Sequence, residues 1–142
     1  MDRVVIEEKL EFLRRCLSRV ADKCPDDMVQ LEQDIDLQDI ITLNLTRAVQ
    51  LSVDIAAHWV AGLEDIPAPG TMDAMFEALV QHGYLDPELA ERMRRSVGFR
   101  NIAVHNYEII EWQLVYAICK YHLDDFACFG KAVYSALPKN EV

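Results

Sequence analysis

Apolar residues recur along most of this chain at the spacing of amphipathic α-helices. The first such segment runs from about Asp2 to Lys23 and carries an apolar residue every three to five positions: Val5, Leu10, Leu13, Leu17 and Val20. Pro25 ends the segment, because proline has no backbone N–H to donate. Asp26 and Asp27 suit the start of another short turn, since carboxylates are favourable near a helix N-terminus. No stretch of useful length alternates as a strand would, so the pattern predicts an all-α protein.

The second long helix, predicted from about Asp36 to Gly62, carries two neighbouring apolar stripes. One stripe consists of Leu37, Ile41, Leu45, Ala48, Ser52, Ile55 and Trp59, and the other of Ile40, Leu43, Val49, Val53, Ala56 and Val60. A helix that contacts a core on one side needs only a single stripe. Two stripes indicate burial on two sides, either against the bundle core and a second subunit or inside a monomer that encloses the helix completely.

A loop and a short helix follow. Residues 62–70 are predicted to form the loop because they include Pro67 and Pro69. The residue types predict a helix from a Thr71 cap to His82, and Gly83 is a typical residue to end it.

Two further segments complete the predicted bundle. Asp86 and Pro87 form a typical helix start, and that helix runs toward Gly98. A last amphipathic segment extends from about Ile109 to Leu137. We predict a single domain, residues 1–142, folded as an up-and-down bundle of four to five main helices.

The composition indicates a globular chain with an acidic surface. The chain has 142 residues, of which 51% are hydrophobic and 27% charged. No apolar run reaches the roughly 20 residues of a spanning helix, and the N-terminus turns acidic before a signal-peptide core could form. We therefore expect a cytoplasmic protein with no membrane partner. The net charge of −10 opposes a broad grip on nucleic acid but leaves room for a small, locally basic site.

The cysteines and acidic residues show no metal-binding pattern. Cys16, Cys24, Cys119 and Cys128 form no C-x-x-C pair and have no neighbouring histidine at zinc-ligand spacing. The acidic string at residues 32–36 is not followed by the glycine and glutamate of a calcium loop. We predict neither a metal nor a cofactor, and we expect the thiols to be structural.

The clearest chemical signal is the string Gly-Phe-Arg-Asn-Ile-Ala-Val-His-Asn-Tyr at residues 98–107. It brings together a fixed cation (Arg100), a titratable imidazole (His105) and a phenol (Tyr107). A guanidinium can clamp a phosphate, and a neutral imidazole can take a proton near pH 7. These two groups are the minimum for cleaving RNA without a metal, so Arg100 and His105 are the candidate catalytic residues.

The spacing constrains how these residues act together. On an ideal helix, residues five apart are separated by about 140°, so Arg100 and His105 point in different directions. Asn101 and His105, four apart, share a face, and Asn101 is a candidate to orient the imidazole. Arg100 and His105 meet only if the helix breaks near Asn106 or if two copies of the chain face each other.

The longer string, Gly-Phe-Arg-Asn-x-x-Val-His-x-Tyr, resembles that of the HepT-like toxin ribonucleases of the HEPN superfamily. The resemblance extends to residues 54–58 and 75–79 and, beyond the motif, to Trp112 and residues 123–126. It implies a HEPN-like homodimer in which two copies of the motif line one cleft. RNA would be cleaved by attack of its own 2′-OH, leaving a 2′,3′-cyclic phosphate, and DNA, which lacks this nucleophile, would be inert.

The same resemblance implies how the activity is controlled. In this family the matching tyrosine is the site at which an MntA-type minimal nucleotidyltransferase attaches AMP. Tyr107 is therefore the expected AMP acceptor, and the expected partner is a cognate nucleotidyltransferase antitoxin. A bulky, negatively charged group beside His105 would block the cleft and repel RNA phosphates.

Two other groups of residues have alternative interpretations. Arg92, Arg94 and Arg95 either focus a positive potential near the motif or form a solvated face that pairs with Glu88 and Glu91. Asp54 and His58 either act as a proton-transfer or metal pair or form a structural hydrogen bond.

The alternative to a ribonuclease is a non-catalytic helical subunit that binds nucleotide or substrate for the nucleotidyltransferase. Such a module needs no arginine and histidine together, and this chain has both. A purely structural helical dimer leaves the motif unexplained.

Overall fold

The computed structural model describes residues 1–63 and 70–138. Its α-helices are α1 (Arg3–Lys23), α2 (Met28–Gln33), α3 (Ile35–Ala61), α4 (Met72–Gln81), α5 (Pro87–His105), α6 (Trp112–Ala117) and α7 (Leu123–Ala136). A 3₁₀ turn, η1 (Tyr107–Ile109), follows α5, and a π-helical turn, η2 (Ile118–His122), joins α6 to α7. Strands are absent from these residues. The prediction of an all-α bundle is confirmed, whereas most of the predicted loop, residues 64–69, lies outside the described residues.

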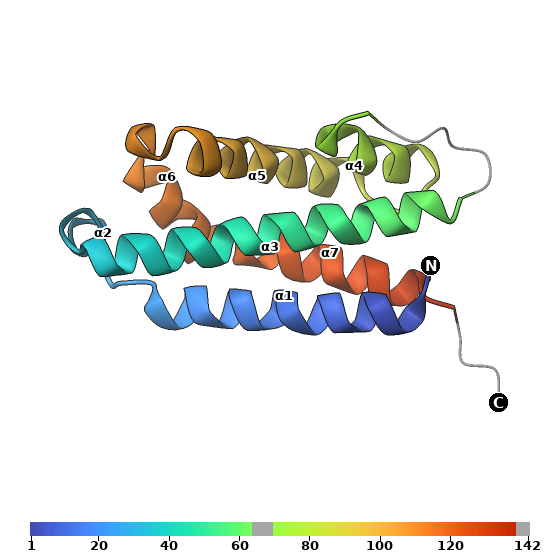
Figure 1. Ribbon diagram of the computed structural model, residues 1–142, viewed down its shortest axis with the longest axis horizontal. Coiled ribbons are helices and arrows are strands. Elements are labelled where there is room, and N and C mark those ends of the chain that lie inside the picture. The colour runs from blue at the N-terminus through green and yellow to red at the C-terminus, as the bar shows by residue number, and fades with distance from the viewer. Residues whose placement is uncertain (64–69, 139–142) are drawn as a thin grey trace.

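The four longest helices, α1, α3, α5 and α7, run side by side in alternating directions (Figure 1). Met1 and the end of α7 lie at the same end of the bundle. The C-terminal end of α5, which carries the candidate motif, lies at the opposite end, near α2 and α6 (Figure 1). None of the helices in the described part of the chain is long and apolar enough to span a membrane.

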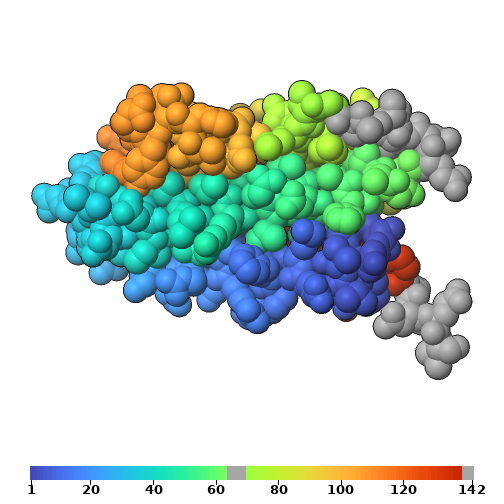
Figure 2. All heavy atoms as spheres, in the orientation of Figure 1, coloured from blue at the N-terminus to red at the C-terminus, as the bar shows by residue number. Residues whose placement is uncertain are grey.

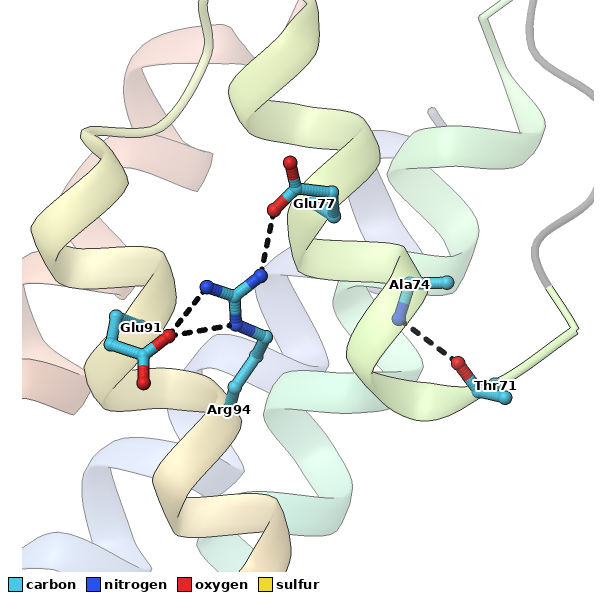
Figure 3. A network of polar contacts seen from close by, with 5 residues as sticks. All are labelled: Thr71, Ala74, Glu77, Glu91 and Arg94. Atoms are coloured by element: carbon cyan, nitrogen blue, oxygen red, sulfur yellow. Dashed lines mark hydrogen bonds and ion pairs between the residues drawn. The ribbon is translucent and has the colours of Figure 1, made fainter.

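Side-chain caps explain where most of the helices begin. Four side chains accept hydrogen bonds from backbone N–H groups in the first turns of α1, α2, α3 and α4: Asp2, Asp27, Asp34 and Thr71. Figure 3 shows the last of these, with Oγ1 of Thr71 3.2 Å from the backbone N of Ala74. Gly83 follows α4 with φ of 76°, as predicted for a helix-ending glycine. Asp86 precedes α5 as predicted, but its side chain makes no capping hydrogen bond.

α3 is the central helix of the bundle. On the face shown in Figure 2, α3 lies between α1 on one side and the C-terminal end of α5 on the other. It contacts α1, α4, α5 and α7. Most members of both predicted stripes are buried by other parts of the same chain. The second stripe is therefore explained by enclosure within one protomer and does not require a subunit interface. Leu43, with 49% of its surface exposed, is the clear exception.

Two helices differ from their predicted extents. α5, predicted to run toward Gly98, extends past it through the motif to His105, since glycine weakens a helix without forbidding it. The helix predicted over residues 109–137 is divided by η2. A π-helical turn adds a residue to the helical repeat, and both Val115 before it and Phe126 after it are buried.

The core has two parts along the bundle. In the larger part, Phe76 of α4 meets Phe129 of α7 edge to face, with ring centres 5.7 Å apart. The smaller part lies at the motif end and includes Leu45, Phe99 and Val115. Phe99 is 5% exposed, so the residue directly before Arg100 anchors this end of α5 in the core.

Candidate functional site

The C-terminal end of α5 is buried on one side and open on the other. Phe99 faces the core, whereas Ile102 and Val104 are 37% and 49% exposed. The polar residues of the motif, Asn101 and His105, are exposed as well. The motif is therefore displayed on a rigid helix that the core holds in place.

The Arg100 guanidinium is free of carboxylates within the described parts of the chain. Its Nη1 donates a hydrogen bond to Oδ1 of Asn101 at 3.1 Å. Its Nε is buried and has no hydrogen-bond partner among the described residues. Apart from the bond to Asn101, no acceptor among the described residues uses the Nη groups, so Arg100 retains donors that can bind an anion.

Two neighbouring arginines of α5 are, in contrast, engaged by carboxylates. Arg94 joins α5 to α4, with Nη1 2.7 Å from Oε2 of Glu77, and it also contacts Glu91 (Figure 3). The Arg94 guanidinium lowers the pKa of Glu91. Nε of Arg95 lies 3.5 Å from Oε1 of the same carboxylate. The predicted ion-paired face is thus present at Glu91, and no ion pair of Glu88 is observed within the described residues.

Arg92 joins α5 to α7. Its Nε donates to Oδ1 of Asp125 at 2.8 Å, and Nδ1 of His122 lies 3.7 Å from the other oxygen of the same carboxylate. Of the four arginines in residues 92–100, Arg100 is consequently the one without a carboxylate partner in the described structure.

His105 is the last residue of α5, and its ring is exposed without a hydrogen bond or ion pair to any described residue. Because α5 is continuous, Arg100 and His105 are separated by about 140° around the axis and about 7.5 Å along it. The helix ends after His105, at Asn106, so its end does not bring the two side chains together. Asn101 also differs from the expectation, since its amide oxygen accepts from Arg100 and not from the imidazole.

Tyr107 lies in the η1 turn and is tied to two other elements. Its hydroxyl donates to Oδ1 of Asp39 on α3 at 2.9 Å. Its ring meets Trp112 of α6 edge to face, with ring centres 6.0 Å apart. Burial, followed by the Asp39 carboxylate, raises the pKa of the phenol. The residue remains 39% exposed, so the hydroxyl is held in place close to solvent.

The fold adds two residues that the sequence did not identify as part of a site. Asp39, 68 residues before Tyr107, meets it only through the packing of η1 on α3. Thr42, one turn further along α3, is 5% exposed, and its Oγ1 has no hydrogen-bond partner in the described residues. The only signal available from the sequence was that both residues flank the apolar stripes of a long helix.

The Asp54–His58 pair is not observed. Asp54 accepts a hydrogen bond from Nε2 of Gln50 at 2.9 Å and lies 3.9 Å from Nζ of Lys9. His58 is exposed in the last turn of α3, where a cation is favourable. The Asp54 carboxylate thus contacts Gln50 on the same helix and Lys9 on α1.

A cavity of about 190 Å³ lies between α3, α5 and the η2–α7 segment. Leu45, Val49 and Phe126 contribute to its apolar wall, and Arg92 and His122 contribute polar atoms. Phe99 of the motif lines it, but Arg100 and His105 do not, so the cavity is separate from the candidate catalytic side chains.

Comparison with known proteins supports a specific family. The family model for ribonucleases of the HepT-like type matches residues 6–133. The mRNA nuclease HepT of Shewanella oneidensis is 32% identical over 125 residues, which cover 88% of this chain and 92% of that protein. The tRNA nuclease HepT of Aphanizomenon flos-aquae is 27% identical and covers 94% of this chain and 90% of its own length.

A solved structure gives the same result for the fold. The tri-AMPylated Shewanella oneidensis HEPN toxin, in complex with its MNT antitoxin, superposes with a TM-score of 0.86 at 30% identity. The match covers 95% of this chain and 99% of that one. Since the family model and these relatives span nearly the whole described bundle, including the motif, the chain belongs to the HepT-like ribonuclease family.

Proposed function

We propose that this chain is an endoribonuclease toxin that cleaves RNA without a metal through Arg100 and His105. The observation that carries the proposal is the state of Arg100 at the end of α5. Among residues 1–63 and 70–138 its guanidinium has no carboxylate partner, while the other arginines of the helix are ion-paired. His105, exposed at the same helix end, supplies the titratable group.

The proposed reaction is an internal transfer at phosphorus. His105 takes the proton from a ribose 2′-OH, which attacks the adjacent phosphorus and displaces the 5′ oxygen. Arg100 donates its planar fork to the phosphoryl oxygens as negative charge gathers on them. The products are a 2′,3′-cyclic phosphate and a 5′-hydroxyl. DNA has no 2′-OH and is not cleaved.

The geometry of α5 favours a composite site in a homodimer. Arg100 and His105 of one protomer diverge by about 140° on a continuous helix. A second copy facing the first supplies the missing group from the opposite side, and its His105 protonates the leaving oxygen. Ile102, Val104 and Ile109 leave apolar surface exposed around the motif, as a subunit interface would require.

Tyr107 is the proposed point of control. Its phenol is 39% exposed, two residues after His105. The S. oneidensis HEPN toxin in the matched complex is AMPylated and bound to an MNT antitoxin. We therefore propose that a cognate MntA-type nucleotidyltransferase attaches AMP to Tyr107, which blocks the cleft and repels RNA phosphates.

The test is RNA cleavage in EDTA by the purified chain, after its intact mass confirms an unmodified Tyr107. Cleavage should leave cyclic-phosphate ends. His105→Ala should lower the rate by about 10²- to 10⁴-fold, and Arg100→Ala by about 10²- to 10³-fold. Arg100→Lys should restore little, because a lysine keeps the charge but loses the fork.

Two control variants come from the chain itself. His58→Ala removes an exposed histidine in the last turn of α3, at the end of the bundle far from the motif. Arg15→Ala removes an exposed arginine of α1. Both should cleave like the original chain. If the folded, unmodified dimer cleaves none of several RNAs, the alternative applies, namely a non-catalytic nucleotide- or substrate-binding subunit of a nucleotidyltransferase complex.

A further inference from the structure

The hydroxyl of Tyr107 already has a base in contact with it. Oδ1 of Asp39 accepts the phenol proton at 2.9 Å, and no other hydrogen bond of this hydroxyl is observed within the described residues. Asp39 is exposed on α3, and Tyr107 is partly exposed in η1. The carboxylate, the phenol oxygen and solvent therefore meet at one point on the surface.

The direction of this hydrogen bond is important for the reactivity of the phenol. The phenol donates, so the lone pairs of its oxygen are not used by Asp39 and remain available to attack an electrophile. Burial and the neighbouring carboxylate raise the pKa of Tyr107, so the hydroxyl keeps its proton near neutral pH. Attack on phosphorus consequently requires that the proton be removed as the new bond forms.

The position of the phenol is fixed before any partner binds. Trp112 holds the ring edge to face, and Asp39 holds its oxygen. Thr42 lies beside the phenol and acts to lower its pKa, opposite to Asp39, although its buried hydroxyl forms no hydrogen bond with a described residue.

We propose that Asp39 is the proton acceptor when a nucleotidyl group is transferred to Tyr107. This inference rests on the proposed modification of Tyr107 by a nucleotidyltransferase partner. The phenol oxygen forms a bond to the α-phosphorus of ATP, and the bond from that phosphorus to the bridging oxygen breaks. Pyrophosphate leaves, and the phenol proton passes to Oδ1 of Asp39 and then to water. The acceptor protein thus contributes a catalytic residue to its own modification.

The alternative is that Asp39 only anchors the tyrosine ring. Asp39→Asn separates the two roles, because asparagine keeps an acceptor oxygen for the phenol but cannot take its proton. Asp36→Asn is the matched control. It removes one exposed carboxylate, one turn earlier on α3, that forms no hydrogen bond with Tyr107.

The experiment uses the full chain, a purified MntA-type nucleotidyltransferase, ATP and Mg²⁺. The rate of adduct formation on Tyr107 is followed by intact mass and peptide mapping across a range of pH. Asp39→Asn should be modified about 100-fold or more slowly, a typical loss for a general base. Its rate should rise with pH as hydroxide replaces the carboxylate, and Asp36→Asn should match the original chain. Circular dichroism and thermal unfolding confirm that each variant is folded.

Equal rates for Asp39→Asn and the original chain would overturn the role of Asp39 and leave the modification of Tyr107 in place. Equally slow modification of Asp39→Asn and Asp36→Asn would also overturn the role of Asp39, because loss of a negative charge alone would then explain the slow rate. A different result, no adduct on Tyr107 of the original chain, would refute the proposed modification itself and, with it, the role of Asp39.

Discussion

Oδ1 of Asn101 accepts a hydrogen bond from Nη1 of the preceding Arg100, at 3.1 Å. Adjacent residues on a helix point about 100° apart, so this contact is made by the flexible ends of the two side chains. It orients the guanidinium at the surface end of α5. Asn101 is therefore a candidate positioning residue for Arg100, in place of the expected role toward His105.

Substitution of Asn101 should affect cleavage moderately and in a graded way. Asn101→Ala removes a hydrogen bond with a net value of about 0.5–1.5 kcal/mol, so kcat/KM should fall by about two- to tenfold. Asn101→Asp should lower it further, because a carboxylate pairs with Arg100 and competes with the RNA phosphate. Steady-state cleavage of a defined RNA checks both variants. The assignment fails if Asn101→Asp is as active as the original chain.

The Arg92–Asp125 ion pair should stabilise the fold with little effect on cleavage. It links α5 to α7, with side chains 38% and 20% exposed. A double-mutant cycle with Arg92→Ala and Asp125→Ala should give a coupling energy of about 0.5–1 kcal/mol from urea unfolding. RNA cleavage by Arg92→Ala should remain close to that of the original chain. A large rise in KM for RNA would instead assign Arg92 to substrate binding.

Gly98→Ala should stabilise the protein. Gly98 lies inside α5, and a Cβ placed there meets no atom within 4 Å, so the substitution introduces no clash. Alanine at an exposed helical position is favoured over glycine by about 0.5–1 kcal/mol. The free energy of unfolding should rise accordingly, with cleavage unchanged. Raised stability combined with lost cleavage would show that a second protomer or RNA approaches the backbone at this glycine.

Cys119 should be the least reactive thiol above neutral pH. Burial, followed by its neighbour Cys24, raises the pKa of Cys119 to about 12, whereas Cys128 is exposed. Alkylation of the folded protein near pH 8.5, the ordinary pKa of a thiol, should label Cys128 first and leave Cys119 unlabelled. Mass mapping of the labelled peptides provides the measurement.

The same shift predicts how stability depends on pH. A thiol whose folded pKa is raised contributes stability that is complete below its unfolded pKa and is lost as pH rises toward the folded value. The free energy of unfolding should therefore fall above about pH 9, and Cys119→Ala should fall less steeply over the same range. Parallel pH profiles for the two proteins would contradict this assignment.

Much of the fold followed from local pattern. The apolar spacing predicted α1 and α3, and the residue types at Thr71 and Gly83 predicted the limits of α4. Predictions failed where a local signal was ambiguous. Asp86 was predicted to cap α5 but makes no side-chain capping hydrogen bond, and the last helix gave no sign of the π-helical turn at residues 118–122.

The sequence by itself determined the long helices α1 and α3, the cap at Thr71 and the string of residues that carries Arg100, His105 and Tyr107. These features depend on helical periodicity and on side chains that bond to their own first turn, so neighbours in the chain are sufficient. Only the tertiary structure decided that both stripes of α3 are enclosed and that Asp39 meets Tyr107. It likewise decided that Arg92 pairs with Asp125 and Arg94 with Glu77. Those outcomes depend on how distant segments pack, because the partners lie 33 residues apart for Arg92 and 68 for Tyr107.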